Sequence, residues 1–365
     1  MADWTIKWLT DWSDVWSPAF LETWTRAFAE DTHPLASPFN HPSVVKAWCL
    51  SHRADDRLEP RFMVATHPQG YWAMMPFVFT PPRWQLGFFT EIAPVGEQLF
   101  DYHDPIIAPV LTDPTVEESF WRAMEASKVL QAGAGADSVV WSRSRRAKQF
   151  TNWSPAPGQA PYLDLRKYPD HDAYFASRKK SLREDLKRQA KRLGALAPCR
   201  YETIESVDEA TAIDWARSLK RFRNQRYGDG GLSWAYLEHL VREYFRSGGP
   251  LHMSALYVGD RDVSWHLSFR SNNRKHWYVP SFDTEFSDFS PGKIHLNLAI
   301  KHSFETSCEE FDFLMGLESY KLGWTDGEKH DAVGYSSMSP SQLVAIKRGM
   351  KTMIRRARRW PRIRG

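Results

Sequence analysis

The junction Ser290-Pro291-Gly292-Lys293 constrains the fold of this chain more than any other short stretch. Before it, Lys275 to Asp283 is rich in aromatic and β-branched residues, which favour a strand. After it, residues at spacings of four and three mark one face of a helix: Ile294, Leu298, Lys301 and Phe304. The sequence therefore predicts a strand, a turn and a helix in succession.

A junction of this kind can hold an anion. Proline fixes φ in the first helical turn and needs no amide partner there, and Gly292 lets a ligand approach the backbone closely. The first N–H groups of the helix lack partners and carry the positive end of the helix dipole. Many helices that bind nothing also begin in this way, so the residues that follow have to decide between the two interpretations.

A second strand pattern, Phe311 to Gly316, follows the helix and leads into Glu318-Ser319-Tyr320-Lys321 and Trp324. The whole run from Ser281 to Trp324 resembles the C-terminal signature of the cellulose-biosynthesis type of GNAT-like acyltransferases, the CelD/BcsL family. In that family a strand ending in a Phe-Asp-like pair leads to Ser-Pro-Gly, a helix, an Asp-Phe strand with glycine, and then Tyr-Lys. The spacing in this chain matches that pattern throughout.

The composition is that of an ordinary globular protein, and 365 residues suffice for two domains with full cores. No apolar run approaches the length of a membrane span, and the first residues resemble no signal peptide, so we expect a cytoplasmic protein. The three cysteines, Cys49, Cys199 and Cys308, are far apart and show no paired Cys/His spacing. We expect reduced thiols and no metal site.

Positive charge is segregated along the chain, although the formal net charge is only +4. Residues 177–193 hold eight Lys or Arg against two acidic residues, and residues 341–365 hold nine against none. The remainder of the chain is therefore acidic. Such segregation indicates a polyanionic partner more strongly than the net charge does.

The first half of the chain alternates predicted strands and helices. Tryptophans at spacings of four, from Trp4 to Trp16, favour packing in the core or at a domain interface over an aromatic binding site. His103 lies between Asp101 and Asp104, which we interpret as turn structure or a substrate contact. Trp153 to Gln159, with two prolines and a glycine, is the predicted domain boundary. The predicted elements are a strand over 4–8, helices over 13–28, 44–48 and 117–131, a hairpin over 62–79 and a strand over 138–142.

The second half repeats this order more clearly. Two helices, one basic and amphipathic and one over Asp208–Arg226, precede three strands, which are expected to form an antiparallel meander: 251–258, 263–270 and 275–283. The resemblance implies an α/β (α+β) fold of tandem GNAT-like domains, each a mixed, mostly antiparallel sheet flanked by helices. Its implied parts are a degenerate N-terminal domain (1–158), a C-terminal domain with the donor site (159–340) and a basic amphipathic tail (341–365). The same duplication occurs in the Fem-type aminoacyl transferases.

The resemblance also assigns roles to individual residues. In GNATs an amine attacks a thioester directly, so acetyl-CoA or another acyl-CoA is the implied donor. The implied cofactor-binding residues are Ser290, Pro291, Gly292, Lys293 and Lys321. Tyr320 occupies the place of the tyrosine that protonates the departing thiolate, and a pKa near 10 for tyrosine suits that acid.

Other candidate residues come from the residue pattern. Period two along Val263–Arg270 places His266 and three other polar side chains on one face and apolar side chains on the other, so His266 is our first candidate base. Asp283 and Glu318 are the other candidates, and a structural role for His266 remains an alternative. The dense basic run that ends the 208–226 helix supplies predicted substrate-binding residues, Arg221, Arg223 and Arg226.

One departure from the GNAT pattern leaves the donor open. Standard GNATs have a longer Gln/Arg-x-x-Gly-x-Gly/Ala loop, of which one glycine remains here, and the Fem-type relatives use aminoacyl-tRNA instead. We predict an acyl-CoA-dependent N-acyltransferase acting on a saccharide acceptor, an amino sugar or related intermediate of exopolysaccharide, cellulose or holdfast-like polysaccharide synthesis. The alternatives are a Fem-like transferase that uses aminoacyl-tRNA and a non-catalytic GNAT scaffold that binds a nucleotide.

The basic tail has its own pattern. Apolar residues at spacings of four and three predict a helix over Ser341–Trp360: Ile346, Met350, Met353, Ala357 and Trp360. The helix either packs on the second domain or binds an anionic partner. The candidate partners are an acidic membrane surface at the inner face, which implies peripheral association, a tRNA backbone, or a cyclic dinucleotide.

Overall fold

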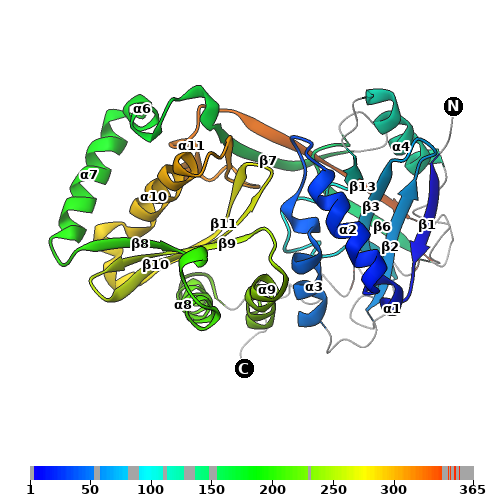
Figure 1. Cartoon of the computed structure of the whole chain (residues 1–365), viewed down its shortest axis with the longest axis horizontal. Coiled ribbons are helices and arrows are strands. Elements are labelled where there is room, and N and C mark those ends of the chain that lie inside the picture. Colours follow the sequence, from blue (N-terminus) through cyan, green and yellow to red (C-terminus); the bar gives the residue numbers. More distant parts are fainter. Residues whose placement is uncertain are drawn as a thin grey trace. The chain divides into compact units, whose positions relative to one another are not determined.

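The protein is described here by a computed structural model (Figure 1). It describes residues 4–52, 58–80, 90–109, 113–126, 136–147, 154–228 and 232–338, and the single positions 344, 346, 349, 350 and 353. The chain divides into two compact units. Unit 1 comprises residues 1–45, 52–157 and 332–365, and unit 2 comprises residues 46–51 and 158–331.

Unit 1 is built on a sheet in the order β1–β2–β3–β4–β6–β13, with β5 paired to β3. Every pair is antiparallel except β4–β6, which is parallel. The strands are β1 (Thr5–Leu9), β2 (Glu59–Thr66), β3 (Trp72–Thr80), β4 (Glu91–Pro94), β5 (Ile106–Ala108), β6 (Ser138–Ser144) and β13 (Lys329–Met338). The helices are α1 (Trp12–Val15), α2 (Pro18–Glu30), α3 (Pro42–Ser51) and α4 (Pro114–Ala126), with a 3₁₀ turn at Pro38–Asn40.

Local chemistry explains where these helices begin. The single helix predicted over 13–28 is wrong, because Ser17-Pro18 divides it into α1 and α2. Proline disfavours helical geometry in the residue before it, and Ser17 then caps α2 by accepting the Phe20 amide. The tryptophans pack in the core, as predicted: Trp4 is buried on Phe120, and Trp16 stacks near Trp24 against Phe62.

Unit 2 is built on a second sheet, in the order β7–β12–β11–β10–β9–β8. Here again one pair, β11–β12, is parallel and the others are antiparallel. Helices α8 and α9 lie on one face and α6, α7 and α10 on the other (Figure 1). The strands are β7 (Ser154–Asp164), β8 (Cys199–Thr203), β9 (Leu251–Val258), β10 (Arg261–Ser271), β11 (Arg274–Phe282) and β12 (Glu310–Asp312). The helices are α6 (His171–Ser177), α7 (Lys180–Gly194), α8 (Glu209–Tyr227), α9 (Trp234–Ser247), α10 (Pro291–Glu305) and α11 (Ser319–Leu322).

The predicted fold class is confirmed, since both sheets are mixed, mostly antiparallel and flanked by helices. A loop was predicted at the boundary, but residues 154–159 belong to the strand β7. The units divide within this strand, at Pro157–Gly158. Residues from Ala332 onward belong to unit 1, because β13 pairs with β6. Strand pairing has thus outweighed the local proline and glycine content.

The predicted tail helix lies for the most part outside the described residues. Ile346 and Met353, two members of its expected apolar stripe, are described and both are largely exposed. Among the described helices, none is both long and apolar enough to cross a bilayer.

Candidate active site

The parallel strands β11 and β12 separate after a short pairing. They pair over three positions, from Arg274 with Glu310 to His276 with Asp312. β11 then continues to Phe282, whereas the chain after β12 turns to β7: the amides of Phe313 and Gly316 donate to the carbonyls of Pro161 and Gln159, each at 2.9 Å. Within the described ranges, no strand pairs with residues 277–282 of β11 on this side. We call these six residues the open edge.

Tyr320 lies at the near end of the open edge. It belongs to α11, and 45% of its surface is exposed. Burial of the hydroxyl, and then the charge of Glu318, raises the pKa of Tyr320 to about 12, while the Trp277 indole acts in the opposite direction. Trp277 is the first residue of the open edge, so a phenol that holds its proton at neutral pH stands beside that edge.

Lys321 fixes the turn that carries Tyr320. Its ammonium donates to the carbonyl oxygens of Met315 at 2.8 Å and Gly316 at 3.3 Å, and it pairs with Glu318 at 2.9 Å. Gly316 has a φ of +105°, a conformation that glycine adopts without strain. Lys321 therefore positions Tyr320 in this structure, and its predicted contact with the cofactor stays a prediction.

The N-terminus of α10 lies at the far end of the open edge. A 3₁₀ helix, Thr284–Phe289, separates it from β11, which corrects the direct strand–turn–helix junction expected from the sequence. Gly292 lies against Phe282, since a Cβ on this glycine would meet the Phe282 ring at 3.3 Å. Ser290 and Pro291 open the helix, with Ser290 at a φ of 50°. Lys293 is engaged by Asp185 of α7 at 3.0 Å.

His266 lies beneath α10. The predicted alternation of β10 is confirmed, because Trp265 stacks on Phe222 of α8 while His266 faces the other way and stacks on Trp277, with ring centroids 3.4 Å apart. His266 has no exposed surface, and burial holds its pKa well below the usual range. Neither ring nitrogen has a hydrogen-bond partner among the described residues. His266 was expected to face a cleft, but it is buried behind Trp277, the first residue of the open edge.

A buried polar layer surrounds His266, and sequence reasoning missed most of it. His295 of α10 bonds Ser254 at 2.8 Å and Ser264 at 2.9 Å through its two ring nitrogens. Burial lowers the pKa of Lys275 to about 7, and its ammonium nitrogen lies 3.5 Å from His252. The alternating serine and histidine residues of β9 and β10 were the available signal.

The two predicted carboxylate bases lie at opposite ends of the open edge. Asp283 is buried, caps the 3₁₀ helix by accepting the Glu285 amide at 3.0 Å, and pairs with Arg261. Glu318 precedes α11 and has an exposed carboxylate that also approaches Lys321. Of the three predicted bases, only Glu318 thus lies beside Tyr320 with solvent access.

The three predicted substrate-binding arginines end α8. Arg226 lies over the ring of Phe282, 5.6 Å from its centroid, and Arg223 lies 5.3 Å from that of Tyr227. Arg221 lies over Phe222. None of the carboxylates in the described part of the chain forms an ion pair with them. Arg226 therefore brings an unpaired positive charge to the same end of β11 as Gly292.

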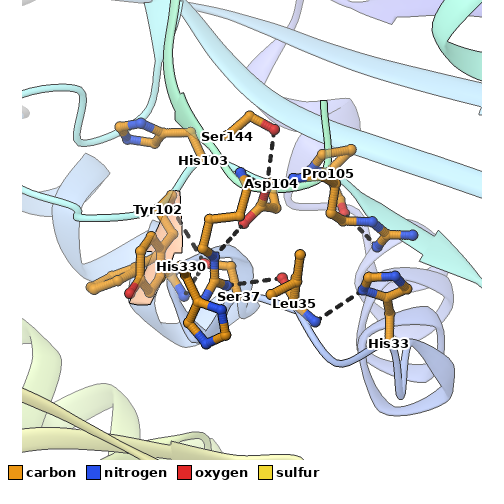
Figure 2. Close-up of polar contacts among 12 residues, drawn as sticks. His33, Leu35, Ser37, Tyr102, His103, Asp104, Pro105, Ser144 and His330 are labelled. Carbon is orange, nitrogen blue, oxygen red and sulfur yellow. Dashed lines mark hydrogen bonds and ion pairs between the residues drawn. The ribbon is translucent and has the colours of Figure 1, made fainter. Parts of the chain in front are cut away.

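Unit 1 also contains one parallel strand pair, β4–β6. Side chains of the unit itself pack beside this pair. The Asp104 carboxylate accepts hydrogen bonds from the Ser144 hydroxyl at 3.0 Å and the Arg145 amide at 2.6 Å (Figure 2). The Arg145 guanidinium also pairs with this carboxylate and stacks 3.4 Å from the centre of the Tyr102 ring. His103 is buried and bonds the Ser142 carbonyl at 3.1 Å. This cluster is structural.

Comparison with known proteins finds a family match within unit 2. Residues 180–322 match the family model described as acetyltransferase (GNAT) domain. Unit 2 thus contains a segment that is similar to a GNAT domain. This match supports an N-acyltransferase, and GNAT domains generally take acyl-CoA as donor. The matched segment contains α7 to α11, and with them Tyr320, Gly292 and the whole open edge.

Solved structures resemble the chain at low identity. A structure of FemX has a TM-score of 0.59 and 10% identity, covers 88% of this chain and 97% of its own, and thus shows the fold. The C-terminal DUF2156 domain of a putative lysylphosphatidylglycerol synthetase from Agrobacterium fabrum has a TM-score of 0.49, 12% identity and coverages of 90% and 96%. A tandem GNAT protein from the clavulanic acid biosynthesis pathway has a TM-score of 0.46, 10% identity and coverages of 93% and 100%. No curated protein matches the sequence.

Proposed function

We propose that the GNAT domain binds acyl-CoA along the open edge of β11 and transfers the acyl group to an amine. One observation carries the proposal: Tyr320 and the N-terminus of α10 lie at opposite ends of the open edge, along which no described strand pairs with β11. Six residues of strand span about 20 Å. That length suits an extended pantetheine arm, with the thioester at Trp277 and the pyrophosphate at Gly292.

The phosphates of the donor would bind at the far end of the open edge, beside the N-terminus of α10. The N-terminus of α10 favours negative charge, because its first N–H groups lack partners within the helix. Arg226 adds a positive charge that no described carboxylate neutralises. Lys293 would contribute after exchanging its partner Asp185. Ser290, Pro291 and Lys321 support the geometry of the two ends.

At the near end the chemistry needs a base and an acid. The acceptor nitrogen attacks the thioester carbonyl, an N–C bond forms, and the C–S bond breaks. Glu318 takes the proton from the acceptor ammonium, and an outward-facing amide of the open edge stabilises the oxyanion. Tyr320 gives its proton to the thiolate as the C–S bond breaks, and the second proton of the attacking nitrogen, released as the amide forms, returns to Tyr320 through water.

For the acceptor, we propose an amino sugar or a related intermediate of polysaccharide synthesis. The support is the resemblance of residues 281–324 to the cellulose-biosynthesis type of GNAT-like enzymes. Arg221 and Arg223 end α8 on the face of the sheet opposite α10. They would suit an acceptor that carries an anionic group.

A second donor is favoured by one observation. Exposed basic residues of α7 lie next to the α10 N-terminus, where Arg192 donates to the Asp288 carbonyl at 3.0 Å and Lys293 meets Asp185. Such a surface suits the phosphate backbone of an aminoacyl-tRNA as well as it suits CoA.

Calorimetric titration of the full-length protein with acetyl-CoA tests the first proposal. We expect binding that weakens about tenfold or more in Gly292→Val, because the new side chain meets the Phe282 ring and disturbs the proposed phosphate site. Gly194→Val is the matched control, since a Cβ at this helix end meets nothing within 4 Å. Equal acetyl-CoA affinity in Gly292→Val and wild type contradicts the proposal. Transfer from aminoacyl-tRNA by a protein that does not bind acetyl-CoA favours the second donor.

A further inference from the structure

Three potential metal ligands meet on unit 2, on residues that take no part in the proposed reaction. Glu310 and Asp312 are two positions apart on β12, so their side chains share one face of the sheet. His330 reaches them from β13. One ligand atom from each of the three residues lies within 4.8 Å of the other two. We propose that Glu310, Asp312 and His330 bind a divalent transition-metal ion of the Mn²⁺ or Zn²⁺ class.

The distances between the donor atoms fit such an ion. The Glu310 Oε1 and His330 Nε2 atoms are 3.2 Å apart. Two donors that each bind one cation at about 2.1 Å are separated by about 3.0–3.4 Å in tetrahedral or octahedral geometry. The ligand atom of Asp312 lies within 4.8 Å of both.

Neighbouring groups hold these side chains in place. The His330 ring stacks on Tyr162, with centroids 4.1 Å apart and planes inclined by 8°, which fixes the direction of its Nε2 atom. Asp312 is fully buried, and its Oδ1 atom accepts the Leu314 amide at 2.7 Å. Glu310 and His330 each keep little more than a tenth of their side-chain surface exposed. Such support for ligands by a second layer is characteristic of metal sites.

The local charge also favours a cation. Two carboxylates share the site, and in the described part of the chain the Arg274 Nε atom lies 3.7 Å from Glu310 without forming a hydrogen bond. Imidazole nitrogen with two carboxylate oxygens is a ligand set for Mn²⁺, Fe²⁺ or Zn²⁺, whereas Mg²⁺ and Ca²⁺ prefer oxygen alone.

The location indicates a structural ion. It would join β12 to β13, and Asp312 begins the turn that Lys321 holds. An ion at this place therefore stabilises the segment that leads to Tyr320. The spacing of cysteine and histidine residues in the sequence did not predict this metal ion.

The test is titration of the full-length protein, stripped with EDTA and dialysed, with Mn²⁺ and with Zn²⁺, followed by calorimetry and thermal unfolding. We expect one site and a Tm increase of about 5 °C at saturation. His330→Phe keeps the stacking on Tyr162 but removes the ligand, and Glu310→Gln keeps the shape but removes the charge. Each should weaken metal binding at least about tenfold.

His171→Phe is the matched control, because His171 also stacks on an aromatic ring, Phe175, and lies 3.6 Å from an aspartate. Its metal affinity should equal that of the wild type. Absence of binding by the wild type, or equal affinity in His330→Phe and Glu310→Gln, overturns the proposal and leaves an ordinary ion pair. If circular dichroism shows that His330→Phe is unfolded, Glu310→Gln decides the question.

Discussion

The two units differ in what lies beyond their parallel strand pairs. Each contains one parallel strand pair, β4–β6 in unit 1 and β11–β12 in unit 2, and each pair is only two or three residues long. In unit 1 the chain itself closes the space beyond the pair: the His103 amide donates to the Arg143 carbonyl, and Trp141 donates to the His103 carbonyl. In unit 2 the corresponding chain turns to β7 and leaves the edge of β11 open.

The polar groups near the two pairs differ accordingly. Around β6, Asp104 is satisfied by Ser144, Arg145 and Arg146, and Arg146 pairs with Asp31 at 3.1 Å. Around β11, both His266 ring nitrogens have no hydrogen-bond partner among the described residues, and near β6 the same holds for His103 Nε2 and Ser142 Oγ. The buried carboxylates beside the closed edge are thus paired within the chain, whereas the His266 ring behind the open edge forms no hydrogen bond with a described residue. The predictions below test this contrast, in order of expected effect.

The largest effect is expected in unit 1. Arg145→Met leaves the fully buried Asp104 carboxylate without its charge partner, and breaking such a pair typically costs about 3–5 kcal/mol. Urea denaturation should show this loss, while acetyl-CoA affinity stays the same. Arg122→Met, in an exposed pair with Glu118, is the control and should change stability little. A loss as small as that of the control would mean that the buried cluster does not hold unit 1 together.

Tyr320→Phe should lower kcat by about 10²- to 10³-fold, because the missing hydroxyl acts on the departing thiolate. Acetyl-CoA affinity should change by no more than about twofold, since the phenol contributes little to the ground state. Steady-state kinetics with a true acceptor, together with calorimetry, separates the two effects. Tyr244→Phe, on α9 beside Phe245, is the control. Unchanged turnover in Tyr320→Phe removes this residue from the mechanism.

The buried lysine of unit 2 should make stability depend on pH. The folded pKa of Lys275 is about 7, below the unfolded value of 10.5, so the unfolded chain holds the extra proton between these pH values. The free energy of unfolding therefore rises with pH over this window, by up to about 1.4 kcal/mol per pH unit. Lys275→Met should flatten the rise in urea denaturation at pH 7, 8 and 9. The same slope in both proteins would show that Lys275 is not buried as described.

The smallest effect distinguishes two neighbouring histidines. His266→Leu removes two unpartnered nitrogens and should leave stability unchanged or raise it by about 1 kcal/mol. His295→Leu removes two hydrogen bonds, to Ser254 and Ser264, and should lower stability by about 1–3 kcal/mol. Thermal unfolding compares the two variants directly. If both lose the same stability, His266 is as well satisfied as His295, contrary to the structure.

Local patterns in the sequence predicted the elements of unit 2 well. The three-stranded meander, the beginning of α10 at Pro291 and the two faces of β10 follow from residue spacing, because each is decided by neighbours in the chain. The same patterns could not show that Lys293 pairs with Asp185, or that His330 meets Glu310. These contacts join residues that only the completed sheet brings together.

The expected place of His266 illustrates the limit most clearly. Alternation correctly assigned it to the face opposite Trp265, but alternation does not say whether that face is a cleft or a core. The position of α10, set by packing of Ile294, Leu296 and Ile300 on the sheet, buries the histidine. In unit 1, likewise, no local pattern indicated that Arg146 would reach back to Asp31.

The last strand of unit 1 also determines the order in which the protein can be assembled during synthesis. β13 supplies residues that pair with β6, with Met338 opposite Ser138, so the first sheet is incomplete until some 200 further residues have left the ribosome. Unit 2 consists of residues 158–331 together with the short segment 46–51, and all of it has been synthesised by then. The first unit to begin is therefore the last to finish, and a contiguous fragment ending at Pro157 lacks one strand of its own sheet.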